Sequence, residues 1–273
     1  MQNIKKTIGN LFKSIFRLAI DLDIVSFLRF FNKNKVIFLF YHGVSFDPYL
    51  EPNNQDGKHV ALYKFEQEMS YIRKKYNVVP VDKAIAMLRR EIEMVPNAIA
   101  ITFDDGYYNN FSCAFPVIKK LNIPVTIFLT IDYLEKGKDG GFLGWEEISD
   151  MHKQGINFGA HTVTHPALTQ VPDDRVKFEL GDSRVRLSRY IKDRVSSFAY
   201  PYGIFNQHIA DMLKDAGYSY AFTTFYGTNT DACDPYKLKR ITVNNNFSFE
   251  YFVVSLFPFL RNITNSIYGW RQS

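Results

Sequence analysis

Cysteine is scarce in this sequence, with only Cys113 and Cys233 among 273 residues. Two cysteines cannot build the disulfide framework of a small secreted domain, and neither lies in a CxxC or similar metal-binding spacing. We therefore interpret both as small apolar side chains. Long apolar runs are also lacking, because no stretch reaches the roughly 18 residues that a membrane-spanning helix needs.

Long runs of basic charge are missing as well. Lys and Arg number 33 against 28 Asp and Glu, which gives a net charge of +5. This mild, scattered excess predicts no nucleic-acid partner, although attraction to an anionic surface stays open. Lys5 and Lys6 are not followed by the uninterrupted apolar stretch and small-residue cleavage site of a signal peptide. The sequence thus predicts a cytoplasmic protein.

Apolar residues, in contrast, are plentiful. They make up 46% of the chain and charged residues 22%, which is enough for a sizeable core. The length suits one large domain, and α/β barrels often reach this size. Aromatic residues make up 16%, which fits either an aromatic-rich core or ring contacts with sugars or a membrane.

The two ends of the chain are apolar and partly basic. Residues 4–31 predict an amphipathic helix, with apolar side chains at helical spacing: Ile4, Ile8, Leu11, Phe12, Ile15 and Ala19. Such a helix either packs on the domain or rests on a membrane. Residues 247–268 are aromatic and apolar too, so the two ends could form one lipid-facing surface or close the ends of a barrel.

Strand and helix patterns alternate between these ends. We expect strands at residues 36–41, 77–81, 98–103, 125–130, 156–160, 197–200 and 220–223. We expect helices at residues 63–75, 84–90, 111–121, 145–154, 173–191 and 207–215, with Asp82 as the N-cap of the second. This alternation predicts a parallel sheet covered by helices, either open or closed into a barrel.

Four polar segments directly follow predicted strands, where α/β folds build their sites. The first is Thr102-Phe103-Asp104-Asp105-Gly106. Adjacent carboxylates in a dry site need a positive partner such as a metal, an Arg or a His. One Asp could then bind a metal while its neighbour acts as a base. The alternative is a solvated Asp-Asp-Gly turn.

The second segment contains His161 and His165. Histidines at i and i+4 share one face of a helical turn, and imidazole is a common metal ligand. With Asp105 as a third ligand, the set would leave open positions for water and substrate, as a catalytic zinc-type site requires.

The third and fourth segments are less specific. Tyr200-Pro201-Tyr202-Gly203 is a turn by its composition, although the Tyr202 N–H could bind an oxyanion and Tyr200 could line a sugar groove. His42 ends the first strand and is followed by glycine, so it is either a general acid or a core or rim histidine. We interpret the other histidines as surface or structural residues: His59, His152 and His208.

Together these segments resemble the polysaccharide deacetylase family, also called the NodB homology domain or carbohydrate esterase family 4. Residues 102–106 match its first motif and residues 161–165 its second, while residues 199–203 resemble its third, usually Arg-x-Pro-Tyr-Gly. The resemblance implies an α/β fold, a distorted (β/α)7 barrel of parallel strands with outer helices. We accordingly expect an amphipathic helical segment at residues 1–34 and the family's catalytic domain at residues 35–273.

Two features depart from the family pattern. Ala199 stands where the third motif usually has the Arg that supports the catalytic base, and Arg240 is a candidate to restore that charge from another strand. No histidine follows His208, so the late Leu-x-His motif that supplies the acid is absent. The branch resembling biofilm poly-N-acetylglucosamine deacetylases has a first-strand Tyr-His instead, which His42 matches.

The resemblance also implies a mechanism. Asp105, His161 and His165 would hold one divalent metal, zinc by ligand type, with cobalt, nickel or iron as alternatives. Asp104 would be the base, His42 the acid and the Tyr202 N–H the oxyanion donor. Tyr200 and Pro201 would contact substrate.

The expected substrate is an N-acetylated amino sugar of a polysaccharide, or of a lipid-linked precursor at the inner membrane face in surface-polysaccharide assembly. Acetate would be released. Two alternatives stay open: removal of a formyl or O-acetyl group from a glycan, and a non-catalytic relative that only binds carbohydrate.

Overall fold

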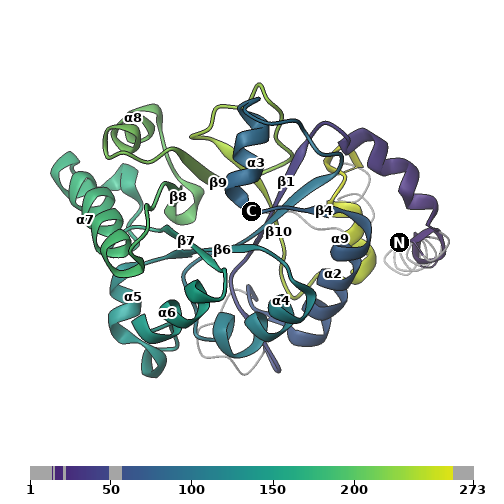
Figure 1. The fold of residues 1–273 in the computed structure, drawn as a ribbon, viewed down its shortest axis with the longest axis horizontal. Helices are drawn as coiled ribbons and strands as arrows, with labels where there is room; N and C mark the ends of the chain where they lie inside the picture. The colour runs from purple at the N-terminus through teal and green to yellow at the C-terminus, as the bar shows by residue number, and fades with distance from the viewer. Residues whose placement is uncertain (1–13, 15, 21–22, 49–56, 261–273) are drawn as a thin grey trace, which may run out of the picture.

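The structure, a computed structural model, describes residues 14, 16–20, 23–48 and 57–260. At its centre is an eight-stranded sheet in the order β1-β10-β9-β8-β7-β6-β5-β4, with every pairing parallel. β1 also pairs with β5, so all strands except β4 close into a ring. This closed seven-stranded barrel, with helices around it, confirms the fold implied by the resemblance (Figure 1).

The elements have the following bounds. The barrel strands are β1 (Val36–Tyr41), β5 (Ala98–Phe103), β6 (Val125–Leu129), β7 (Asn157–Ala160), β8 (Ser197–Ala199), β9 (Tyr220–Tyr226) and β10 (Leu238–Thr242), and β4 is Asn77–Val78. A separate short pair consists of β2 (Val44–Ser45) and β3 (Val60–Ala61). The α-helices are α2 (Leu62–Lys75), α3 (Val81–Leu88), α4 (Phe115–Leu121), α5 (Ile131–Lys136), α6 (Trp145–Lys153), α7 (Asp173–Ile191), α8 (Gln207–Asp215) and α9 (Phe249–Ser255).

The inside of the barrel is filled by aromatic rings. Phe222 of β9 lies edge-on to Phe38 of β1, with ring centroids 4.8 Å apart, and 5.4 Å from Phe128 of β6. All three are fully buried, and each such ring contributes about 1.5–3 kcal/mol through its burial. Since outer helices cover the other face, a strand such as β1, with the sequence Val-Ile-Phe-Leu-Phe-Tyr, is apolar throughout. The barrel is therefore a packed core, and a site can form only at its ends.

Several local expectations need correction. Asp82 is not the N-cap of α3, because the helix already starts at Val81 after Pro80; the Asp82 carboxylate instead accepts a hydrogen bond from the Tyr220 hydroxyl at 2.6 Å. The helix expected at 111–121 begins with a π-helical turn, η2 (Asn110–Ala114). The sequence analysis predicted no strand with bounds near those of β10 (Leu238–Thr242).

The chain ends are only partly described. Of the helix expected at residues 4–31, residues 16–20 are α-helical, and a 3-10 helix, η1 (Ile24–Asn32), follows Asp23, whose left-handed backbone interrupts the α-helix. Within residues 247–268 the structure has α9 and the 3-10 turn η6 (Pro258–Leu260). Residues 1–13 and 261–273 lie outside the described part. Within that part, no helix is both long enough and apolar enough to span a bilayer.

Candidate active site

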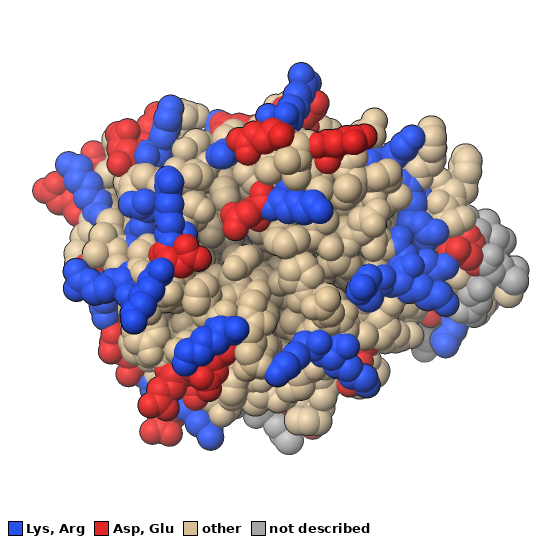
Figure 2. Space-filling view, in the orientation of Figure 1, with Lys and Arg blue, Asp and Glu red and all other residues tan. Residues whose placement is uncertain are grey.

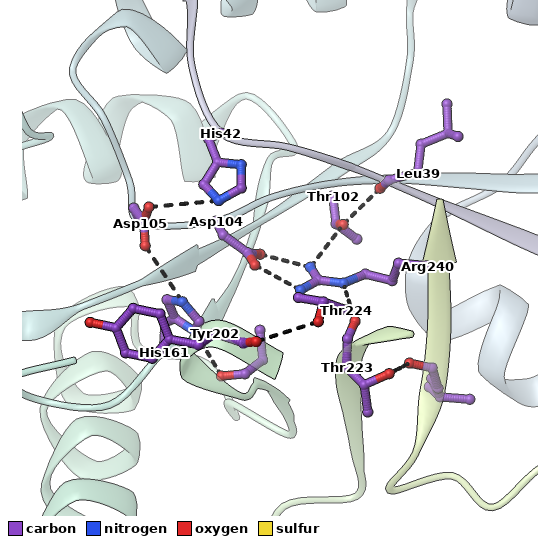
Figure 3. A network of polar contacts seen from close by, with 12 residues as sticks. Leu39, His42, Thr102, Asp104, Asp105, His161, Tyr202, Thr223, Thr224 and Arg240 are labelled. Atoms are coloured by element: carbon purple, nitrogen blue, oxygen red, sulfur yellow. Dashed lines mark hydrogen bonds and ion pairs between the residues drawn. The ribbon is translucent and has the colours of Figure 1, made fainter. Parts of the chain in front are cut away.

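Polar side chains from five strands meet at one end of the barrel (Figure 3). His42 follows β1, Asp104 and Asp105 follow β5, and His161 follows β7. Tyr202 lies in the 3-10 turn η5 (Pro201–Gly203) after β8, and Arg240 reaches in from β10. Parallel strands all end at the same rim, so residues separated by up to about two hundred positions in sequence come together there.

Asp105, His161 and His165 converge as the sequence predicted. The Asp105 Oδ1 lies 3.5 Å from the His161 Nε2 and 3.3 Å from the His165 Nε2. The two Nε2 atoms are 3.1 Å apart. Four ligands at ~2.1 Å around a tetrahedral zinc ion are separated by about 3.4 Å. The three atoms therefore have the spacing of one face of such a tetrahedron.

The chemistry of these three groups also fits a cation. Oδ1 of Asp105 is buried and has no hydrogen-bond partner among the described residues. Burial alone would raise the pKa of Asp105, but the neighbouring imidazoles of His161 and His165 outweigh this effect and keep the pKa well below its usual range. The His161 Nδ1 lies 2.7 Å from the carbonyl oxygen of Ala199, which can only accept, so Nδ1 carries the proton and Nε2 offers a lone pair.

The segment that carries the two histidines is not helical, contrary to the expectation from their spacing. Residues 161–165 form a loop in which Thr162 and His165 have φ of 71° and 63°. Asp105 and Gly106 also lie in the left-handed region, both with φ of 72°. Such conformations are unfavourable for residues other than glycine, and they concentrate at functional sites. The loop, rather than one face of a helix, brings both imidazoles to the same point.

Asp104, which precedes Asp105 in the chain, pairs with Arg240. The guanidinium Nη1 and Nη2 lie 2.7 Å from Oδ1 and 2.7 Å from Oδ2 of Asp104, a bidentate arrangement. Burial alone would raise the pKa of Asp104, but the Arg240 charge and hydrogen bonds outweigh it and lower this pKa. The Asp104 carboxylate is therefore ionised and buried, and the guanidinium of Arg240 balances its negative charge.

Arg240 is fully buried and is itself fixed on several sides. Its Nε donates to the Thr223 carbonyl at 3.0 Å, and its guanidinium carbon lies 4.0 Å from the Phe40 ring centroid. A planar guanidinium stacks well on an aromatic face. Arg240 of β10 therefore gives the Asp104 carboxylate a positive partner, which Ala199, at the usual arginine position of the third motif, cannot provide.

His42 lies beside the triad, near the Asp105 carboxylate oxygen that does not face His161. Its Nε2 is 3.9 Å from the Asp105 Oδ2, and its Nδ1 is buried without a hydrogen-bond partner among the described residues. Burial lowers the pKa of His42 to about 4, despite the opposing effect of Asp105 and Asp104. In this state the ring is neutral near pH 7.

The η5 turn gives a mixed result. Tyr202 has φ of 59°, its ring is 58% exposed, and it lies edge-on to His165 at 4.7 Å. Tyr200, in contrast, is fully buried; its ring stacks on Phe205, and its hydroxyl donates to the Tyr236 carbonyl. Pro201 is buried as well. The sugar groove predicted at Tyr200 is therefore not supported, and the exposed ring at this rim is that of Tyr202.

Sequence reasoning missed two groups that shape the site. Asn110 donates to the His42 carbonyl at 2.7 Å, and Glu179 of α7 binds the loop at 163–164. Glu179 occurs on the buried stripe of α7 with Val176, Leu180, Ser183 and Leu187, and a carboxylate at apolar spacing is a signal that could have drawn attention to it.

The remaining described histidines lie outside the triad. His59 is buried beneath Gly43 and contacts Asn109, and His152 lies 3.2 Å from the Ile156 carbonyl. His208 forms an exposed pair with Asp173.

Comparisons with known proteins agree with this geometry. Residues 92–221 match the family described as polysaccharide deacetylase. The Bacillus subtilis protein YxkH, named for the same family, is 27% identical over 222 residues, covering 80% of this chain and 75% of its own. The Staphylococcus aureus poly-beta-1,6-N-acetyl-D-glucosamine N-deacetylase is 22% identical over 205 residues, covering 71% and 70%.

Solved structures share the fold. The Streptococcus pyogenes deacetylase PplD, in complex with acetate, has a TM-score of 0.74 at 23% identity, covering 82% of this chain and 99% of its own. A Bacillus cereus polysaccharide deacetylase has a TM-score of 0.72 at 26% identity, covering 82% and 69%. The motifs, the barrel and these matches agree in relating the chain to the polysaccharide deacetylase family, whose model matches residues 92–221.

Proposed function

We propose that the chain is a metal-dependent hydrolase that removes an N-acetyl group from an amino sugar of a polysaccharide or a lipid-linked glycan precursor. One observation carries this proposal: Asp105, His161 and His165 converge on one point, beside the compensated carboxylate of Asp104. The names of the relatives support the reaction, since the Staphylococcus aureus protein is an N-deacetylase of an N-acetylglucosamine polymer.

In this proposal the triad holds one divalent cation, for which zinc suits the two imidazoles and one carboxylate, and cobalt, nickel or iron are alternatives. A cation held there acts as a Lewis acid toward the acetyl carbonyl and makes water more acidic. The residues of the chain supply the proton transfers and orient the reacting groups.

Asp104 is the proposed base. It is ionised, buried and not part of the triad, so it can accept the proton of the attacking water. Arg240 holds the carboxylate in one orientation through both of its oxygens. Tyr202 would donate its backbone N–H to the developing oxyanion, since this N–H has no acceptor among the described residues.

His42 is the proposed acid. Its ring lies across the Asp105 carboxylate from His161, where the leaving nitrogen of the sugar would be protonated. Because burial lowers the pKa of His42 to about 4, the ring would take up a proton from solvent and release it at once to the amine, while Asp104 would return the proton of the attacking water to solvent. Acetate and a free amino sugar are the products.

An acetate-release assay tests this function. The wild-type chain with Zn²⁺ or Co²⁺ is expected to release acetate from N-acetylglucosamine oligomers, and a chelator should abolish the release. Asp104→Asn should lower turnover by roughly 10²–10⁴-fold while the cation still binds. Asp150→Asn, an exposed change on α6, is the matched control. Full turnover in chelator, or in Asp104→Asn, would defeat the proposal.

We further propose that the chain works in the cytoplasm, at an anionic membrane face. A patch of exposed phenyl rings lies at one side of the molecule: Phe27, Phe30 and Phe31 of η1, and Phe259 of η6, are 70%, 68%, 47% and 49% exposed. Phe31 and Phe259 join its two parts, with ring centroids 5.0 Å apart. We call these four rings the phenyl patch.

The sequence on either side of the described residues is basic. Residues 1–13 and 261–273 contain no acidic residue and five basic ones: Lys5, Lys6, Lys13, Arg261 and Arg271. Their combined charge of +5 equals the net charge of the whole sequence. Figure 2 shows further Lys and Arg side chains gathered at the side where η1 lies. Each basic residue near an anionic bilayer contributes about 1 kcal/mol, and aromatic rings anchor at headgroup depth.

A further inference from the structure

A carboxylate outside the site binds the loop that carries His165. Glu179 of α7 is completely buried. Its Oε2 accepts the backbone N–H of Val163 at 2.7 Å and that of Thr164 at 2.9 Å, and its Oε1 accepts the Thr164 hydroxyl at 2.7 Å. Arg175, one turn earlier on α7, pairs with Oε1 at 2.8 Å. Glu179 therefore connects α7 to the middle of the segment 161–165.

This connection falls between the two strained residues of the loop. Thr162 and His165 have positive φ, a conformation that residues with a Cβ rarely adopt without support. The two successive N–H groups of Val163 and Thr164 point to one side and form a small anion-binding concavity, which the Glu179 carboxylate fills. The loop conformation that presents His165 thus depends on an acceptor at this position.

The two histidines of the triad differ in what fixes them. His161 is oriented by its own Nδ1, which donates to the Ala199 carbonyl. For His165, the hydrogen bonds in the described structure are the contact with His161 and the bond from its own backbone N–H to the Thr162 hydroxyl. Its ring is otherwise only flanked by Tyr133 and Tyr202. The position of His165 is therefore set by its backbone, and the backbone is held by Glu179.

We propose that Glu179 is a positioning residue of the cation site, acting through the Val163 and Thr164 amides to set the place of the His165 Nε2. This inference rests on the proposed function, because it presumes that the triad binds a divalent cation. A purely structural Glu179 would stabilise the fold and leave the geometry of the triad unchanged.

The test is the affinity of the apo protein for Co²⁺, measured by titration and by its visible spectrum. Glu179→Gln keeps the size of the side chain but replaces one acceptor oxygen by an NH₂ group that cannot accept. We expect Co²⁺ to bind roughly 10–100-fold more weakly, as for other outer partners of metal ligands, with an altered spectrum. Glu147→Gln is the matched control, since Glu147 also accepts a backbone N–H, that of Gly144 at 2.9 Å, but at the start of α6.

The outcomes separate the two proposals. If the wild type binds no Co²⁺, the proposed function fails. If the wild type binds and Glu179→Gln binds with the same affinity and spectrum, the positioning role is overturned. The thermal unfolding of each apo protein shows whether the variant is folded at the titration temperature. If Glu179→Gln does not fold, Thr164→Val decides: it removes one of the three loop bonds, and an unchanged Co²⁺ affinity would overturn the inference.

Discussion

Arg240 and Asp104 show how one buried charge depends on another. The two residues are 0% and 3% exposed, and the guanidinium contacts both carboxylate oxygens. In the related pattern, an arginine just before the Pro-Tyr-Gly turn supports the base, whereas here the same position is Ala199. Only β9 separates β10 from β8 in the barrel, so a long side chain from β10 can reach the same point.

Removing this arginine should strongly destabilise the protein. Arg240→Met keeps most of the apolar stem but leaves Asp104 buried without its partner. We expect the free energy of unfolding to fall by about 3–5 kcal/mol in urea titrations at neutral pH. Adding Asp104→Asn should recover part of this loss, because it removes the unpaired charge. Independent, additive effects of the two substitutions would contradict the pairing.

Among the elements, those with strong periodicity were predicted closely. α7 and α8 have the predicted bounds, and β1 and β5 coincide with buried apolar runs. Short elements were harder to predict, because their secondary structure depends on the elements that they pair with. β10 contains Lys239 and Arg240 in five residues, so its sequence has no apolar run, and only its pairing with β1 and β9 makes it a strand.

The residues of the candidate site could be predicted from the sequence, but the backbone conformations that position them could not. The carboxylates and histidines stand out because strand ends bring them together. The loop at 161–165 could not be predicted, since His-x-x-x-His is compatible with a helical turn and the structure depends on Glu179, which is distant in sequence. The burial of Tyr200 likewise follows from its packing against Phe198 and Phe205, not from its own motif.

The contact between α2 and β1 predicts a pH effect. Glu68 of α2 is buried, and its Oε2 accepts the Tyr41 hydroxyl at 2.9 Å. Burial raises the pKa of Glu68 to about 8 from 4.5. Between these values the folded state keeps a proton that the unfolded state has lost, so this group's contribution to stability is full at low pH and declines as the pH rises from 4.5 to 8.

Glu68→Gln should remove that decline. The side chain keeps an acceptor for Tyr41 but cannot ionise, so the stability of the variant relative to wild type should increase steadily between pH 5 and pH 8. Denaturant unfolding across this range measures the difference. Glu66→Gln, on the exposed side of the same helix, is the control. Parallel pH curves for wild type and Glu68→Gln would show the expectation to be wrong.

On the scale of the whole molecule, the phenyl patch and the barrel mouth are separate features. η1 precedes β1 in the chain, whereas His42 follows β1, so the patch and the site are associated with opposite ends of that strand. A protein resting on the patch would leave the mouth accessible to a glycan.

Vesicle binding tests the patch. Cosedimentation with phosphatidylglycerol vesicles is expected for the wild type, with weaker binding at high salt and to phosphatidylcholine. The double change Phe27→Ser and Phe30→Ser should reduce binding by at least about tenfold, because each buried ring is worth about 1.5–3 kcal/mol. Phe225→Ser, which removes the ring of a 56% exposed residue near the end of β9, should leave binding unchanged. Equal loss in both variants would exclude a specific patch.

The pairing of β1 with β10 also determines when the protein can begin to work. A ribosome adds residues 238–242 about two hundred residues after residues 36–41, so β1 has no β10 to pair with while the residues between them are made. Until Arg240 emerges, Asp104 has no counter-charge. Nascent or prematurely terminated chains should therefore attract chaperones and proteases, and a shortened messenger would yield no partly active enzyme.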